Sequence, residues 1–466
     1  MKMKFYIKIS IIVLVLAVIL SGCGASAGDP GEETSGTNRP GSNITDGNGN
    51  QQDSTHDLQG SDDGNGENSG SVDPYKGMPD GSEPGDDRPG DGRPGYEDDG
   101  NDIEVRIKEM TLDEKIGQMF IIGFEGKTIS DELTDMLKTR APGGVILFSS
   151  NVKSPEQLLD LINSIKSTNS GREPLFISVD EEGGRVSRMP ESLTDIPSAA
   201  SIGEYGDISI SYEIGSLLAE EISSFGFNMD FAPVLDIFSN PDNKVISDRS
   251  YGNTAQAVSE HGIQLMKGIR EKGVIPVVKH FPGHGDTVAD SHKELPVVEH
   301  DMGRLTSSEL VPFQKAVDEN ADAVMVGHLL MKAIDPENPA ALSEAVITDL
   351  LRIQMGFAGV VMTDDMTMGA ITKNYDIGDA VVSSVIAGSD IILVCHGYDN
   401  QIQAIDAVRS AVETGDIDEA RIDESVARIL RLKAKYGLED RIIENVDIEG
   451  LNKKIDAQLV KWYNRD

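Results

Sequence analysis

The segment KHFPGHGDTVADSH, residues 279–292, holds three of the eight histidines of the chain, together with two aspartates and a lysine. It follows directly on the apolar run VIPVV, residues 274–278. Side chains of these types can bind a metal ion or transfer protons. Three interpretations are therefore open: a metal site, a proton-transfer device, or a polar surface turn without a chemical role.

The metal interpretation uses imidazole and carboxylate groups, which suit zinc or a related ion. A proline and a glycine separate the first two histidines, so these two imidazoles do not share one face of a helix. No His-x-His pair stands at the end of an early strand. We therefore expect no metal and no other cofactor. The ligands that this alternative would use are His280, His284, His292, Asp286 and Asp290.

The proton-transfer interpretation rests on Asp290 and His292, which are two residues apart. An aspartate at this spacing in a loop can accept a hydrogen bond from one ring nitrogen of the histidine. That bond fixes the tautomer and raises the pKa of the imidazole, and it leaves the other nitrogen free to donate or accept a proton. Gly283 and Gly285 allow the positive φ angles that would bring His292 over a bound substrate.

Asp364 is the candidate for the second reacting group. It follows the apolar run GVVMT, residues 359–363, so its carboxylate is expected at the end of a strand. A carboxylate in that position can attack the anomeric carbon of a sugar and form a covalent intermediate that water then cleaves. Its neighbour Asp365 could act instead, or both could cap the following helix.

The elements that must position these residues alternate along the chain. Short β-branched apolar runs are separated by amphipathic helical segments, which is typical of a parallel α/β fold. Eight such runs predict a (β/α)8 barrel, and a doubly wound open sheet is the alternative. A further helix is predicted over 421–436, with Arg428, Arg431 and Lys433 on its polar face. The predicted strands are 118–123, 144–148, 175–179, 227–234, 274–280, 323–327, 359–363 and 390–395, and the predicted helices between them include 155–167, 209–225, 254–272, 306–319 and 343–355.

Charged or imidazole side chains stand at the ends of five of these runs. In a barrel, the carboxyl ends of the strands and the loops behind them meet on one face, where active sites lie. One aspartate after a strand is usually a helix cap, but the joint pattern predicts a single site. The residues at these ends are Asp180, Lys279 with His280, His328, Asp364 and His396.

The N-terminal region indicates where the protein is located. Residues 1–22 have a lysine-rich start, an apolar stretch and the ending LSG before Cys23, which resembles a bacterial lipoprotein signal peptide. Cleavage would leave a lipid on Cys23 and anchor the protein on the extracytoplasmic face of the cell membrane. Residues 23–101 are rich in Gly, Asp, Ser and Pro, and they predict a disordered acidic tether. A catalytic domain is expected over 102–440 and a tail over 441–466.

The net charge of −38 argues against a nucleic acid partner, because phosphates would be repelled. After lipidation of Cys23 only Cys395 remains, so we expect no disulfide within the chain. The fold must then be held by burial of apolar surface.

From about Met110 to Tyr436 the chain resembles glycoside hydrolase family 3, in its β-N-acetylglucosaminidase branch. The stretches LLRIQ (350–354) and GVVMTDDMT (359–367) fit the family's signature around its nucleophile. The stretch KHFPGHGDT (279–287), closing with DSH (290–292), fits the motif of that branch. Many relatives carry a second α/β domain, for which this chain is too short, so the barrel must supply the whole acid/base pair.

The resemblance implies a role for each matching residue. Asp364 would be the nucleophile, His292 the general acid/base, and Asp290 its partner. Glu181 stands where the family commonly has Gln, which would add negative charge beside the site. The residues that would bind the sugar are Asp180, Arg188, Arg249, Lys279 and His280.

The activity implied is that of a retaining exo-β-N-acetylglucosaminidase that removes terminal GlcNAc by double displacement. Its natural substrates are expected to be peptidoglycan fragments, since the tether would place the enzyme beside the cell wall. A neutral imidazole repels an anionic nucleophile less than a carboxylate does, so phosphate could replace water in the second step. Two alternatives remain: a metal-dependent barrel hydrolase and a sugar-binding lipoprotein without catalytic activity.

Overall fold

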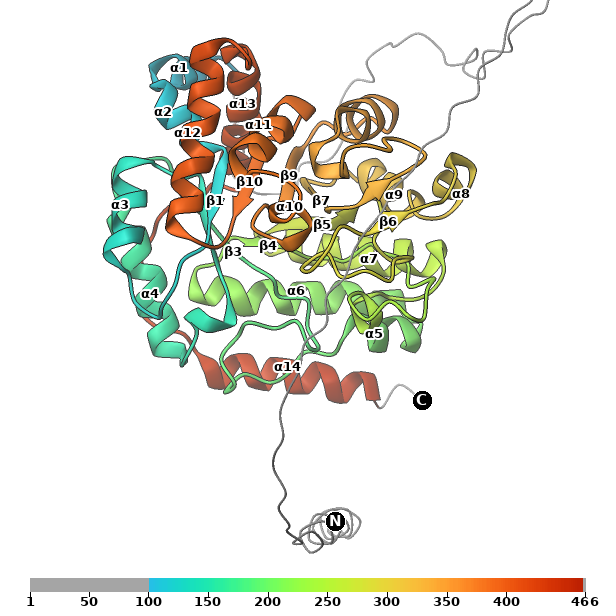
Figure 1. Ribbon diagram of the computed structural model, residues 1–466. Coiled ribbons are helices and arrows are strands. Elements are labelled where there is room, and N and C mark those ends of the chain that lie inside the picture. Colours follow the sequence, from blue (N-terminus) through green and yellow to red (C-terminus); the bar gives the residue numbers. More distant parts are fainter. Residues whose placement is uncertain (1–99, 464–466) are drawn as a thin grey trace, which may run out of the picture. The chain divides into compact units, whose positions relative to one another are not determined.

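The computed structural model describes residues 100–463. The predicted signal peptide, Cys23 and nearly all of the predicted tether therefore lie outside the described residues. Eight parallel strands form a closed barrel, in which the first strand pairs with both the second and the last (Figure 1). The predicted (β/α)8 barrel is confirmed, and the open sheet is excluded. The barrel strands are β1 (Phe120–Ile122), β2 (Gly144–Leu147), β3 (Phe176–Val179), β4 (Met229–Asp230), β5 (Ile275–Phe281), β7 (Ala323–Val326), β9 (Val360–Asp365) and β10 (Ile391–Val394).

Helices follow the strands and surround the barrel (Figure 1). Polar side chains accept hydrogen bonds from the first free N–H groups of many of them, as Ser154 and Thr254 do. Glycines in the left-handed region end others, such as Gly226 with φ 101°. The helices are α1 (Gly100–Glu109), α2 (Leu112–Gln118), α3 (Asp131–Thr139), α4 (Pro155–Thr168), α5 (Ala199–Tyr205), α6 (Ile208–Phe225), α7 (Ala255–Glu271), α8 (Met302–Ser307), α9 (Val311–Asp318), η4 (Ala345–Gln354), α10 (Gly369–Thr372), α11 (Ile377–Ala387), α12 (Tyr398–Thr414), α13 (Glu419–Lys435) and α14 (Ile448–Tyr463), with single turns at η1 (Ser149–Asn151), η2 (Ser247–Arg249) and η3 (Ala340–Leu342).

Three predicted elements differ from the structure. The fourth strand was expected over 227–234 but pairs regularly only at Met229–Asp230, because Pro233 has no N–H to donate. The helix expected over 306–319 is two helices, α8 and α9, separated where Ser308 leaves helical geometry. The helix expected over 343–355 is present as η4, with the wider hydrogen bonding of a π-helix.

A separate two-stranded parallel sheet, β6 (Val297–Val298) with β8 (Leu330–Met331), lies beyond the barrel strands. The C-terminal tail forms α14, which lies along α6 (Figure 1). Ile455 and Trp462 of α14 are buried, and the indole Nε1 of Trp462 donates to Glu213 Oε2 at 3.3 Å. The tail therefore packs on the domain surface.

Buried ion pairs join helices to the amino ends of two strands. Asp390, which is fully buried before β10, accepts from Arg352 at 2.6 Å and from Arg428 at 3.0 Å. Asp322, before β7, pairs with Arg270 at 2.9 Å and Lys435 at 2.5 Å. Removing one partner of a buried pair leaves an uncompensated charge, so these contacts hold the outer helices in place. They lie at the opposite ends of the strands from the residues predicted to do chemistry.

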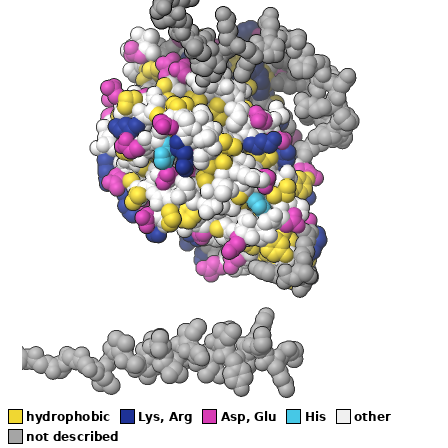
Figure 2. All heavy atoms as spheres, turned by 90° about the vertical axis from the view of Figure 1, so that its right-hand side faces the viewer, with side chains coloured by type: hydrophobic (Ala, Val, Ile, Leu, Met, Phe, Trp, Pro, Cys, Tyr) yellow, Lys and Arg dark blue, Asp and Glu magenta, His cyan; other side chains and the backbone are white. Residues whose placement is uncertain are grey.

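The surface carries charges of both signs. On the face seen in Figure 2, acidic and basic side chains are interspersed with exposed hydrophobic ones. Among the described residues, no helix has the length and the apolar content needed to cross a membrane.

Candidate active site

A pocket of about 670 Å³ opens at the carboxyl ends of the barrel strands. It is lined by side chains from β2, β5, β7, β9 and β10 and from the loops that follow the strands. The structure brings together all eight residues that the sequence proposed for catalysis or sugar binding. They are Asp180, Arg188, Arg249, Lys279, His280, Asp290, His292 and Asp364.

An ionic network forms one wall of the pocket. Lys279, with only 1% of its side chain exposed, donates to Asp180 at 2.6 Å and to Glu182 at 2.7 Å. Arg249 grips the carboxylate of Glu182 with two nitrogens, at 2.8 and 2.7 Å. Burial alone would raise the pKa of Glu182, but the adjacent Arg249 and Lys279 outweigh it and hold this pKa below its usual range. Asp180 therefore reaches the pocket as a carboxylate beside a buried ammonium, an arrangement suited to binding vicinal hydroxyls.

His280 is oriented from behind by Asp236, which the sequence analysis did not single out. Its Nδ1 lies 2.6 Å from Asp236 Oδ2, and its Nε2 lies 3.4 Å from the guanidinium of Arg249. Because a carboxylate oxygen can only accept, Nδ1 donates this hydrogen bond to Asp236. The other oxygen of Asp236 accepts from the backbone N–H of His284 at 2.6 Å. One fully buried carboxylate thus fixes both histidines.

Asp364 and Asp365 differ in what they contact. Asp365 is engaged: its Oδ1 accepts from the backbone N–H groups of Thr367 and Cys395, both at 2.9 Å, and its Oδ2 accepts from the hydroxyl of Thr367. Within residues 100–463, the Asp364 carboxylate accepts a single hydrogen bond, from the N–H of Asp365 at 2.8 Å. Burial would raise the pKa of Asp364, but the imidazoles of His328 and His280 outweigh it and lower this pKa. Asp364 is therefore ionised at neutral pH and has a carboxylate oxygen available to the pocket.

The remaining strand-end histidines have different surroundings. His328 is fully buried and donates from Nε2 to the carbonyl of Asp365 at 3.0 Å. His396 lines the pocket and stacks on Phe148, with ring centroids 5.2 Å apart. His328 therefore supports the turn that presents Asp364 and does not line the pocket.

The loop that carries His292 is anchored along its length. Gly283 has φ 127°, as expected, whereas Gly285 is required for space, since a Cβ there would lie 1.7 Å from the carbonyl oxygen of Ile237. The ring of His284 bridges Thr287 at 2.7 Å and Ser291 at 3.2 Å. The far end of the loop is held by α10, whose N–H groups at 369 and 370 donate to the carbonyls of residues 292 and 291. Because α10 follows β9, these hydrogen bonds connect the loop of His292 to the strand that carries Asp364.

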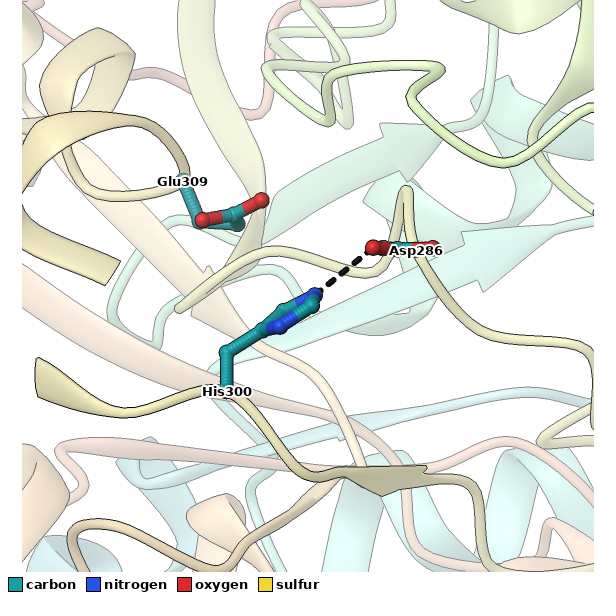
Figure 3. Close-up of side chains that lie close together, drawn as sticks. All are labelled: Asp286, His300 and Glu309. Carbon is teal, nitrogen blue, oxygen red and sulfur yellow. Dashed lines mark hydrogen bonds and ion pairs between the residues drawn. The ribbon is translucent and has the colours of Figure 1, made fainter. Parts of the chain in front are cut away.

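A cluster of Asp286, His300 and Glu309 has the composition of a metal site, with ligand atoms within 4.8 Å of one another (Figure 3). These groups already have partners. His300 Nε2 lies 2.6 Å from Asp286 Oδ2, and Arg304 binds Glu309 through two nitrogens at 2.8 to 3.1 Å. We interpret the cluster as a clamp that joins the loop of His292 to the segment between β6 and α9. It includes Asp286, but the other four residues of the metal alternative do not take part.

The predicted hydrogen bond between Asp290 and the ring of His292 is not formed in this structure. Asp290 Oδ1 accepts from the backbone N–H of His292 at 3.0 Å, and Asp290 Oδ2 pairs with Lys293 Nζ at 3.0 Å. The physical reason is local: an aspartate readily caps the N–H two residues ahead, and a lysine three residues ahead reaches its other oxygen. The ring of His292 is exposed at the pocket.

Glu181 does not add charge to the pocket, contrary to the expectation from the sequence. It is 2% exposed, and its Oε2 accepts from the backbone N–H of Arg188 at 2.8 Å. Burial raises the pKa of Glu181 to about 7. Its carboxyl group therefore supports the segment that carries Arg188 and is largely protonated below neutral pH.

Comparisons with known proteins agree with this geometry. The model of the glycosyl hydrolase family 3 N-terminal domain matches residues 111–432. A β-hexosaminidase A of Pseudoalteromonas piscicida is 34% identical over 66% of this chain, which spans only 56% of that protein. A β-hexosaminidase of Nitrosomonas eutropha is 33% identical over 67% of this chain and 91% of its own length.

Among solved structures, a family 3 β-N-acetylglucosaminidase from Paenibacillus sp. str. FPU-7 is 40% identical, with a TM-score of 0.71 over 75% of this chain and 68% of its own. The resemblance seen in the sequence is thereby confirmed over the whole barrel. The chain belongs to glycosyl hydrolase family 3, and it is a glycoside hydrolase with β-hexosaminidases among its relatives.

Proposed function

We propose that this protein is a retaining exo-β-N-acetylglucosaminidase that hydrolyses terminal, non-reducing GlcNAc. The observation that carries the proposal is the contrast between two adjacent aspartates. Asp365 is engaged by two backbone N–H groups and a hydroxyl, whereas Asp364 has an ionised carboxylate free to face the pocket. An ionised carboxylate with a lowered pKa is suited to attack an anomeric carbon and form a glycosyl ester.

The reaction would proceed in two steps. In the first, Asp364 attacks C1 while His292, as imidazolium, donates a proton to the departing glycosidic oxygen. In the second, neutral His292 accepts a proton from water, and the resulting hydroxide equivalent attacks C1 and releases Asp364. Asp180, Lys279 and Arg249 would hold the sugar hydroxyls, with the ring of His280 held in place by Asp236. Binding the sugar in one orientation converts each displacement into a step between positioned groups.

We further propose that the natural substrates are GlcNAc-terminated fragments of peptidoglycan and that the protein is lipid-anchored at Cys23 on the outer face of the cell membrane. The support is the sequence alone: LSG before Cys23 and an acidic, polar stretch of about eighty residues. Incorporation of labelled fatty acid into the wild type but not into Cys23→Ser would test the anchor. A label present in both would contradict it.

The nucleophile is tested by covalent trapping. A GlcNAc glycoside with fluorine at C5 and an activated leaving group should accumulate as an ester on the peptide that contains Asp364, detected by mass spectrometry. Asp364→Gly should neither be labelled nor turn over an aryl GlcNAc glycoside, whereas Asp379→Asn, on the surface helix α11, should behave like the wild type. A label on a peptide that lacks residue 364 would refute the assignment.

The two alternatives make different predictions. A metal-dependent hydrolase would lose activity on dialysis against a chelator, and a non-catalytic binder would retain GlcNAc without releasing it from any glycoside. The proposed mechanism predicts full activity after chelation and a measurable turnover.

A further inference from the structure

Lys293 stands at the mouth of the pocket, next to the proposed acid/base. Its side chain is 78% exposed, and its ammonium lies 3.0 Å from Asp290 Oδ2. The other oxygen of Asp290 accepts from the backbone N–H of His292. Both oxygens of the carboxylate that should orient the ring of His292 are therefore engaged elsewhere.

The lining of the pocket is more basic than the chain as a whole. The chain has a net charge of −38, yet six basic and four acidic side chains line the pocket. Three of the basic ones are exposed: Arg185, which pairs with Asp248 at 2.6 Å, and the two lysines Lys244 and Lys293, which come from different loops. Lys244 donates to the carbonyl of Pro241 at 3.1 Å and, in the described part of the chain, has no carboxylate partner. The mouth thus offers two ammonium groups to an anion.

We propose that Lys293 makes the enzyme selective for substrates whose leaving group carries a carboxylate. In the free enzyme the ammonium of Lys293 pairs with Asp290 and holds it away from the ring of His292. The carboxylate of the leaving group competes for this ammonium, and its binding releases Asp290. The proposal rests on the proposed function, since it assigns a role to the leaving-group side of the same pocket. An exposed ion pair between residues three apart is among the weakest in proteins. A second carboxylate that approaches Lys293 can therefore displace Asp290 at little cost.

Release of Asp290 from Lys293 changes the hydrogen bonding of His292, the proposed general acid. Its free oxygen can then accept from one ring nitrogen of His292, which fixes the tautomer and raises the pKa of the imidazole. The other nitrogen is left directed at the glycosidic oxygen. Substrates with an anionic leaving group would meet a better oriented acid than neutral substrates do.

The test uses Lys293→Gln and two aryl β-GlcNAc glycosides whose leaving phenols are equally acidic, one with a neutral amide and one with a carboxylate. The wild type should prefer the carboxylate substrate by roughly fivefold in kcat/KM, the scale of an exposed ion pair. The variant should lose that preference through faster turnover of the neutral substrate, because Asp290 is permanently free. Lys293→Arg should keep the preference, as should Lys272→Gln, a matched change at an exposed lysine that does not line the pocket.

A second measurement separates release of Asp290 from the simple loss of a positive charge near His292. Both raise the pKa of His292 and move the alkaline limb of kcat/KM to higher pH. Only release requires Asp290, so Lys293→Gln should give no rate increase on the neutral substrate in an Asp290→Asn background. An unchanged preference in Lys293→Gln, or an increase that persists without Asp290, overturns the inference. If the wild type cleaves neither glycoside, the proposed function itself fails.

Discussion

Asp236→Asn tests whether one buried carboxylate builds the sugar-binding wall. Asp236 accepts from His280 Nδ1 and from the backbone N–H of His284, both at 2.6 Å, and it is fully buried. An amide has one acceptor oxygen and one donor group, so it can satisfy only one of these two donors. The other N–H would face an NH2 group.

The magnitude follows from these contacts. A hydrogen bond to a charged group contributes about 1.5–3 kcal/mol, and an unsatisfied buried donor costs about 1–3 kcal/mol. Allowing for local relaxation, we expect Asp236→Asn to lower the free energy of unfolding by about 3 kcal/mol and the Tm by roughly 4 °C, the shift for a domain of this size. The displaced His280 should lower kcat/KM on an aryl GlcNAc glycoside on the order of 100-fold.

The assay combines urea unfolding, followed by circular dichroism, with steady-state kinetics at a temperature where the variant is folded. Asp390→Asn is the matched control, because Asp390 is equally buried and charged but lies at the other end of the barrel. It should lose comparable stability and keep its kcat/KM. If Asp236→Asn kept normal kinetics, or if both variants lost activity equally, the role given to Asp236 would be refuted.

Three further outcomes are expected. A carboxyl group with a raised pKa contributes stability that is present below the unfolded value near 4.5 and is lost as the pH rises through about 7. Compared with the wild type, Glu181→Gln should therefore be more stable at pH 8 than it is at pH 5, by up to about 3 kcal/mol in urea unfolding. An equal effect at both pH values would contradict this. Gly285→Ala places a Cβ against the carbonyl of Ile237, so thermal unfolding should show a loss of about 1–3 kcal/mol and assays a lower kcat; an unchanged Tm would mean that the backbone is free to move. Deleting residues 447–466 removes the buried apolar side chains of α14 and should cost at least about 4 kcal/mol in urea unfolding, whereas wild-type stability would show that the packing on α6 contributes nothing.

The strands and helices were predictable where local pattern decides them. Runs such as GVVMT before Asp364 are apolar and β-branched, which favours a buried parallel strand. The prediction failed where a local feature broke the run, as Pro233 does after β4 and Ser308 does between α8 and α9. Lys433 was expected on a polar helix face but is buried, donating to Gln118 Oε1 at 2.7 Å and to the carbonyl of Gly143 at 3.0 Å. Periodicity cannot reveal such a partner, because it lies 315 residues away.

The proposed site residues were identified by motif and by their positions at strand ends, and the structure brings them together in one pocket. The residues missed were those that act through others. Asp236 follows the apolar run of the fourth strand and could have been noticed there, but nothing in the sequence says that it fixes two histidines. Glu182 directly follows Asp180 and Glu181 in the sequence, yet its pairing with Arg249 and Lys279 depends on contacts between segments far apart in the chain.

The sequence by itself predicted the alternating strands and helices, the family and the residues proposed for catalysis and sugar binding, because strand pattern and motif are local properties of the chain. Only the tertiary structure decided which of two adjacent aspartates is free, that Glu181 is buried and turned from the pocket, and that Asp290 pairs with Lys293 and not with the ring of His292. These outcomes depend on which donors surround each carboxylate and on how far burial shifts its pKa. Both are set by segments that meet only when the barrel closes.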